Sequence, residues 1–322
     1  MNNKKIYYKQ VRDLGGIFSA TFGFIKSNFK TLYGSLLFFA GPFLMVAATV
    51  SSYMLGSSLS FTKLYGGGLN RMYGDLILSY FAAMMIMFLG ITVYNVILNR
   101  NLIENEKLSM DEPLTLKHAT IDFWPDFWRI LGNSLLVVVL LVVATVVIVF
   151  VFAGIFALMG GGNSTGSVIL AVLGVIALFI SMLLFGPILA YVPMAALFVC
   201  QRDQIGIFQA LGKVFRYLKG NFWITWVVSM VGLLVYMVMG TVVQLPVFIV
   251  SLITTFSRVN TTVGYGLQDQ STPILLIVVT AISSLLSYGV MVIYHLIAIY
   301  QYTNLEEKKE GVSIIDKINQ IQ

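Results

Sequence analysis

The sequence predicts an all-α integral membrane protein, with about six transmembrane helices forming three hairpins that each follow an amphipathic interfacial helix. Composition is the first reason, because 58% of the 322 residues are hydrophobic and only 11% are charged, against roughly 25% charged residues in soluble domains. The second reason is the stretch between Arg129 and Arg202, which contains no charged residue. A charge at the bilayer centre costs about 2.5–3.5 kcal/mol, so this stretch is expected to lie in the membrane.

Six apolar runs along the chain account for the expected spans. They cover approximately residues 32–55, 76–98, 130–159, 168–200, 222–256 and 273–302. A helix perpendicular to the bilayer needs only about 20 apolar residues to cross the hydrocarbon core, and several of these runs are longer. We therefore expect the helices to tilt, to kink or to extend beyond the bilayer.

Prolines within the runs mark the expected kinks, because proline removes an intrahelical hydrogen bond and clashes with the preceding turn. These residues are Pro42, Pro187, Pro193 and Pro246. At Pro246 the alternative is a complete break, in which the fifth helix ends near Gln244 and a separate piece follows. Polar side chains within the runs, such as Asn95, Gln244 and His295, either line a cavity or form hydrogen bonds between helices.

The distribution of Lys and Arg predicts the orientation in the membrane. If both termini are cytoplasmic, the outer loops hold only Lys63, Arg71 and Arg258 of the 20 Lys and Arg residues. Cytoplasmic loops of membrane proteins carry an excess of these residues. An odd number of spans would spoil this distribution, so we expect a multi-pass protein of the bacterial cytoplasmic (inner) membrane with both termini inside.

The chain also reads as three copies of one unit within a single membrane domain, residues 1–322. The stretch 24–37 aligns with 123–136, with Phe24 opposite Phe123 and Lys30 opposite Arg129, and a shorter stretch at 219–223 aligns with 26–30. The repeats are expected at approximately 13–100, 113–202 and 205–303. Each copy would place an amphipathic segment on the cytoplasmic face and then two spans.

Aromatic residues in these segments are the expected interfacial anchors. They are Phe29, Trp124, Trp128, Phe222 and Trp223. A helix with aromatic residues on one face and Lys, Arg or Asn on the other lies in the membrane interface. A turn at Ser27-Asn28, and another at Gly220-Asn221, would then direct the chain into the bilayer.

The last residues, 304–322, are expected to form a cytoplasmic tail. The segment Glu306-Glu307-Lys308-Lys309-Glu310 reads as a solvated charge run, and an apolar stripe follows from Val312 to Ile321. This stripe predicts a short amphipathic helix. Such a helix could lie on the membrane or dock on a partner protein.

No pattern of an enzyme or cofactor site is present. The glycine runs at 66–68 and 160–162 lack the Lys and Ser/Thr of a phosphate-binding loop. The two histidines, His118 and His295, are not accompanied by clustered metal ligands. We therefore expect no catalytic residue, no cofactor, no metal ion and no nucleic-acid partner.

The repeated segments, Phe24-Ile25-Lys26-Ser27-Asn28-Phe29 and Lys219-Gly220-Asn221-Phe222-Trp223, give the chain a resemblance to a known group. It resembles a loose group of uncharacterised bacterial six-span proteins, including the membrane domain attached to some glycerophosphodiester phosphodiesterases. The stretch 305–311 is similar to membrane proteins of Bacteroidota. The soluble phosphodiesterase domain is not part of the resemblance, so no catalytic residue follows from it. By analogy, the resemblance implies companionship with an AAA-type ATPase system.

Three functional hypotheses follow. The first is a non-enzymatic scaffold or subunit of a larger membrane-associated assembly, whose partners are the lipid bilayer and other membrane proteins. The second is a transporter or channel-like protein for an apolar or lipid-like substrate, motivated by the proline-containing spans. The third is an intramembrane enzyme that uses His295.

Overall fold

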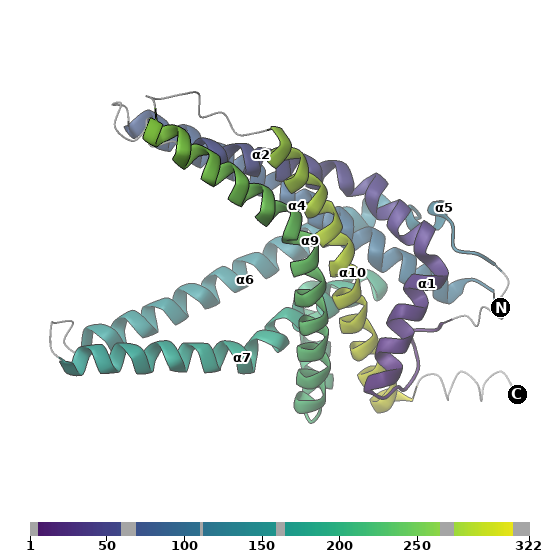
Figure 1. Cartoon of the computed structure of the whole chain (residues 1–322). Coiled ribbons are helices and arrows are strands. Elements are labelled where there is room, and N and C mark those ends of the chain that lie inside the picture. The colour runs from purple at the N-terminus through teal and green to yellow at the C-terminus, as the bar shows by residue number, and fades with distance from the viewer. Residues whose placement is uncertain (1–5, 59–68, 110–111, 159–164, 265–273, 312–322) are drawn as a thin grey trace, which may run out of the picture. The chain divides into compact units, whose positions relative to one another are not determined.

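The computed structural model describes residues 6–58, 69–109, 112–158, 165–264 and 274–311, and in these ranges the regular structure is entirely helical (Figure 1). The helices are α1 (Leu14–Phe39), α2 (Gly41–Ser58), α4 (Leu69–Lys107), α5 (Leu116–Ala119), α6 (Phe123–Leu158), α7 (Thr165–Arg202), α8 (Ile207–Leu218), α9 (Phe222–Gly264) and α10 (Ile274–Glu310). The expected outer turns at 66–68 and 160–162 and the expected helix from Val312 to Ile321 lie outside the described residues.

The predicted fold class is confirmed: the chain has an all-α integral membrane fold. Helices α4, α6, α7, α9 and α10 are each long and apolar enough to cross a membrane, and α1 with α2 forms a sixth candidate as a bent pair. The two helices of this pair meet at Ala40 at an angle of 54°. Pro42 lies in the first turn of α2, where a helix tolerates proline because the missing N–H would have no intrahelical partner there.

Proline does not end the other helices. Pro187 and Pro193 lie inside α7, and α9 runs through Pro246 as one helix. The alternative of a complete break near Gln244 is therefore wrong. Membrane helices tolerate proline because neighbouring groups and small local adjustments satisfy the freed backbone.

The predicted turns are confirmed as breaks in helical geometry. Asn28 has non-helical dihedral angles inside α1, and Gly220, between α8 and α9, has a φ of +87° that favours glycine. Helix α8 is amphipathic: it buries Ile207 and Val214, exposes Phe208 and Phe215 beside them, and carries Arg216 on its polar side. This pattern is that of a helix in the membrane interface.

The chain divides into two compact units. Unit 1 comprises the described parts of 1–7, 19–123 and 234–296, and unit 2 those of 8–18, 124–233 and 297–322. Each unit is assembled from segments distant in sequence. The threefold repeat stays a prediction.

In unit 1, α2 packs along α4 (Figure 1). Gly90 of α4 allows this approach, because a Cβ atom there would lie 2.8 Å from Cδ2 of Leu44 and 3.0 Å from Cβ of Phe43. Small residues serve this purpose in membrane proteins, where helices associate through close packing. In the same unit, Asn101 donates a hydrogen bond to the hydroxyl of Ser35 on α1 at 3.0 Å.

In unit 2, charged side chains join the ends of α7 and α10. Both terminal nitrogens of Arg202 donate to the carboxylate of Glu306 at 2.6 Å, a bidentate geometry that adds strength and specificity. Glu306 and Glu307 are only 8% and 4% exposed. The expectation that the whole charge run is solvated is therefore wrong, because α10 continues to Glu310 and folds these carboxylates against unit 2.

The same cluster continues to α8 through Asp203. Arg202 Nε and Lys213 Nζ donate to Asp203 at 2.7 and 2.6 Å. Burial by itself raises the pKa of Asp203, but the hydrogen bonds and charges of Arg202 and Lys213 outweigh it and lower the pKa below its ordinary value. Asp203 is therefore a structural anion that fixes the turn between α7 and α8.

At the other end of α8, Tyr217 and Arg216 both donate to the carboxylate of Glu310, the last residue of α10. Burial and the hydrogen bond to Glu310 raise the pKa of Tyr217 to about 12. The C-terminal end of the amphipathic helix α8 is thus held directly to α10.

Candidate intramembrane binding site

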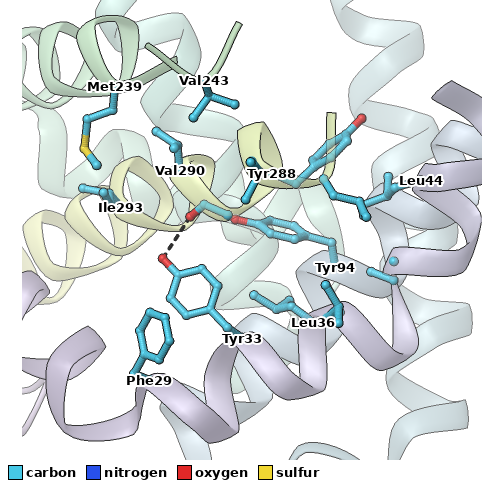
Figure 2. Close-up of a pocket in the computed structure, with 16 residues that line it drawn as sticks. Phe29, Tyr33, Leu36, Leu44, Tyr94, Met239, Val243, Tyr288, Val290 and Ile293 are labelled. Carbon is cyan, nitrogen blue, oxygen red and sulfur yellow. Dashed lines mark hydrogen bonds between the residues drawn. The ribbon is translucent and has the colours of Figure 1, made fainter. Parts of the chain in front are cut away.

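Unit 1 contains a partly open cavity of about 330 Å³ among α1, α2, α4, α9 and α10 (Figure 2). Ligand pockets in proteins have volumes of roughly 300–1,000 Å³, so this cavity has the size of a small ligand site. Its lining is aliphatic except for Phe29, Tyr33, Tyr94 and Tyr288, and it contains no charged side chain among the residues described. The cavity therefore suits an apolar molecule.

Tyr33 closes one side of the cavity by joining α1 to α10. Its hydroxyl donates to the backbone oxygen of Gly289 at 3.0 Å (Figure 2). Glycine permits this contact, since a Cβ atom at Gly289 would lie 3.2 Å from the Tyr33 ring. Phe29 lies one helical turn away, with its ring centroid 4.7 Å from that of Tyr33.

Tyr94 reaches the cavity from α4. Its side chain is 1% exposed, and its ring centroid lies 6.4 Å from that of Tyr288 and 5.9 Å from that of His295. The Tyr94 hydroxyl has no hydrogen-bond partner within the described part of the chain. A buried polar group left in this state costs about 1–3 kcal/mol, so the free hydroxyl is a feature that needs an explanation.

His295 lies behind Tyr94 and is completely buried. Neither of its ring nitrogens has a partner among the described residues. It does not line the cavity itself, but its ring packs against Tyr94, which does.

A second hollow of about 410 Å³ adjoins the first, since Leu44 and Tyr288 line both. Its lining is more polar and includes Ser51, Tyr236, Gln244, Thr280, Ser284 and Ser287. The side-chain amide of Gln244 donates to the hydroxyl of Ser287 at 3.0 Å, which links α9 to α10. The first cavity is therefore apolar, and the hollow beside it carries neutral polar groups.

The structure brings only some of the predicted polar and kink positions near this site. Gln244 lines the second hollow, and His295 contacts Tyr94. Asn95 points elsewhere, because its amide donates to the backbone oxygen of Ile91 within α4 at 2.9 Å. Pro42 and Pro246 are exposed residues of unit 1.

Pro187 belongs to unit 2 and does not line this cavity. Its backbone oxygen accepts a hydrogen bond from the hydroxyl of Ser229 at 2.8 Å, which joins α7 to α9 in that unit.

The expected interfacial anchors are mostly exposed, as side chains in contact with lipid would be. Trp124, Trp128 and Trp223 are 65%, 64% and 66% exposed. Phe222 is half-buried, with its ring against Trp223. Phe29 is 57% exposed and also lines the cavity, so it lies at the rim of the cavity.

Sequence reasoning missed Tyr33, Tyr94 and Gly289. A signal existed for Tyr94, because tyrosine in membrane helices concentrates at the two interfaces and this one lies within an apolar run. Tyr33 and Gly289 gave no such signal, because their importance comes from a contact between α1 and α10.

No protein-family model, curated protein or solved structure matches the chain. The resemblance to the membrane domain of glycerophosphodiester phosphodiesterases therefore stays a prediction.

Proposed function

We propose that this protein binds an apolar, lipid-like molecule in the cavity of unit 1 and acts as a transporter or carrier for it in the membrane. The cavity itself is the observation that supports this proposal. Its wall combines aliphatic side chains with aromatic rings and no charge, as in sites that recognise apolar ligands. Five helices contribute to the wall, so small shifts between them could open or close it.

The test compares two tryptophan substitutions on α10. Leu286 lines the cavity and is 54% exposed, whereas Ile282 is 52% exposed and lines neither hollow. The full chain in lipid nanodiscs is irradiated with a long-chain hydrocarbon that carries a diazirine, and labelled peptides are located by mass spectrometry. We expect label near residues 285–293 in the wild type.

Leu286→Trp should reduce this labelling about tenfold, because the larger side chain takes up part of the cavity, and a tenfold loss corresponds to about 1.4 kcal/mol of binding free energy. Ile282→Trp should leave it unchanged. Equal labelling of both variants and of the wild type would show that the hydrocarbon only samples the outer surface, and the proposal would then be wrong.

A second candidate is the scaffold or subunit hypothesis, and the low burial of α6 and α7 supports it. In the most apolar windows of these helices only 17% and 11% of residues are buried. Lipid alone can cover the exposed faces of α6 and α7. The test must therefore determine how many protein chains one particle contains. A particle mass in native nanodiscs that exceeds one chain supports an assembly, and a consistent single chain argues against it.

The proposed location is the bacterial cytoplasmic membrane with both termini inside. The distribution of Lys and Arg supports this orientation, and so does the interfacial geometry of α8. Partnership with an AAA-type ATPase rests on resemblance alone, and a co-purified ATPase identified by mass spectrometry would be its test.

A further inference from the structure

We propose that the ligand of the unit 1 cavity is a neutral lipid with a hydroxyl group, which forms hydrogen bonds with Tyr94 and Tyr33. This inference rests on the proposed function and specifies the chemical class of the ligand. It starts from the free hydroxyl of Tyr94, which lies in the wall of the cavity and is almost completely buried. Figure 2 shows the Tyr94 ring reaching from α4 toward α10, where Tyr33 approaches from α1.

The two tyrosines offer complementary hydrogen-bonding capacity. The Tyr33 proton is already donated to Gly289, so the Tyr33 oxygen remains as an acceptor. The Tyr94 hydroxyl still has its proton to donate. A hydroxyl group is both donor and acceptor, and it can therefore accept from Tyr94 while donating to Tyr33.

The absence of charge in the lining selects against ionic headgroups. Neither hollow is lined by Lys, Arg, Asp or Glu among the described residues. A phosphate, sulfate or ammonium group would enter without a counter-charge, and burial of an unpaired charge is very unfavourable. A neutral hydroxyl loses only hydrogen bonds to water, and the tyrosines replace them.

The adjoining polar hollow provides space for the remainder of a neutral headgroup. Its Gln244 donates through the amide nitrogen to Ser287, and the amide oxygen of Gln244 is a further acceptor. Long-chain alcohols, isoprenoid alcohols and acylglycerols share this chemistry of an uncharged hydroxyl on a hydrocarbon chain.

The experiment uses three diazirine probes of equal chain length on the full chain in nanodiscs. One is an alkane, one a primary alcohol and one an alkyl sulfate, which stays anionic at every working pH. We expect the alcohol to label the cavity peptides about two- to tenfold more than the alkane, the range that corresponds to one net hydrogen bond. The alkyl sulfate should label them least.

Tyr94→Phe should remove the preference for the alcohol over the alkane. Tyr80→Phe is the matched control, since Tyr80 lies on the same helix, is exposed and lines neither hollow. A preference that survives Tyr94→Phe, or alkyl sulfate labelling equal to that of the alcohol, overturns this inference while the cavity proposal stands. Failure of all three probes to label the cavity overturns the cavity proposal itself.

Discussion

At the scale of single residues, two tyrosines of the cavity wall differ in one respect. Tyr33 donates a hydrogen bond to Gly289 at 3.0 Å, whereas the Tyr94 hydroxyl has no partner in the described part of the chain. Phenylalanine keeps the ring of each side chain, the buried ring of Tyr94 and the half-buried ring of Tyr33. Removal of each hydroxyl therefore isolates the effect of hydrogen bonding.

Tyr33→Phe should destabilise the ligand-free protein, because the Gly289 carbonyl loses its side-chain donor. The expected loss is about 0.6 kcal/mol, the average for hydrogen bonds between membrane helices. Tyr94→Phe should be neutral or stabilising, since it removes a buried hydroxyl that is not hydrogen-bonded. Thermal unfolding in one detergent measures both variants, and a larger loss for Tyr94→Phe would contradict the assignment.

At the scale of helices, close packing of α2 on α4 depends on Gly90. An added Cβ would meet Leu44 and the Cβ of Phe43 at 2.8 and 3.0 Å, and the second of these atoms cannot move without the backbone of α2. We expect Gly90→Ala to lower stability by about 1–3 kcal/mol, the usual cost of overpacking.

Gly240→Ala on α9 is the control for this substitution, since an added Cβ there meets nothing within 4 Å. It should be neutral or slightly stabilising, because alanine has the higher helix propensity. Denaturant or thermal unfolding of the two variants checks the difference. Equal effects would show that α2 does not approach α4 at Gly90.

The stability of the ion-pair cluster that joins α7, α8 and α10 depends on pH through Asp203. Its folded-state pKa lies below the ordinary value, so the unfolded chain binds its proton first as the pH falls. The stabilisation is complete above the ordinary aspartate pKa of about 4 and disappears as the pH falls through the folded-state pKa. Asp203→Asn should lower the melting temperature at pH 7 and flatten its dependence on pH below about 5.

Glu112→Gln serves as the comparison, because Glu112 is exposed. That variant should keep the acid sensitivity of the wild type. Melting temperatures measured from pH 3 to pH 7 give the three profiles, and an unchanged slope in Asp203→Asn would rule out this role of Asp203.

At the scale of the whole molecule, orientation in the membrane is the main prediction. Cys200 is the only cysteine and is buried, so a Cys200→Ser background permits single-cysteine labelling. Lys308→Cys, at an exposed position near the end of α10, should react only after an impermeant thiol reagent gains access to the cytoplasm. Ser271→Cys, in an expected outer loop, should react in intact cells. The reverse result would invert the proposed topology.

Hydropathy predicted the membrane class and most of the spans, and particular residues show why it succeeded. The run from Ile130 to Met159 is uncharged, and a helix is the way for such a segment to satisfy its backbone in lipid. This run corresponds to α6, which begins earlier, at Phe123, and is described as far as Leu158. The bend at Ala40 and the continuity of α9 through Pro246 were less predictable, because proline is compatible with a helix start, a kink or a continuous membrane helix.

The sequence by itself determined the all-α membrane class and two of the breaks in helical geometry, at Asn28 and Gly220. Only the tertiary structure decided that Tyr33, Tyr94 and Gly289 meet around one cavity and that Glu306 pairs with Arg202. The physical reason is that hydrophobicity and backbone hydrogen bonding act locally along the chain. The pairing of helix faces depends instead on side chains from distant segments, and in lipid all apolar faces have similar free energy until shape and hydrogen bonds distinguish them.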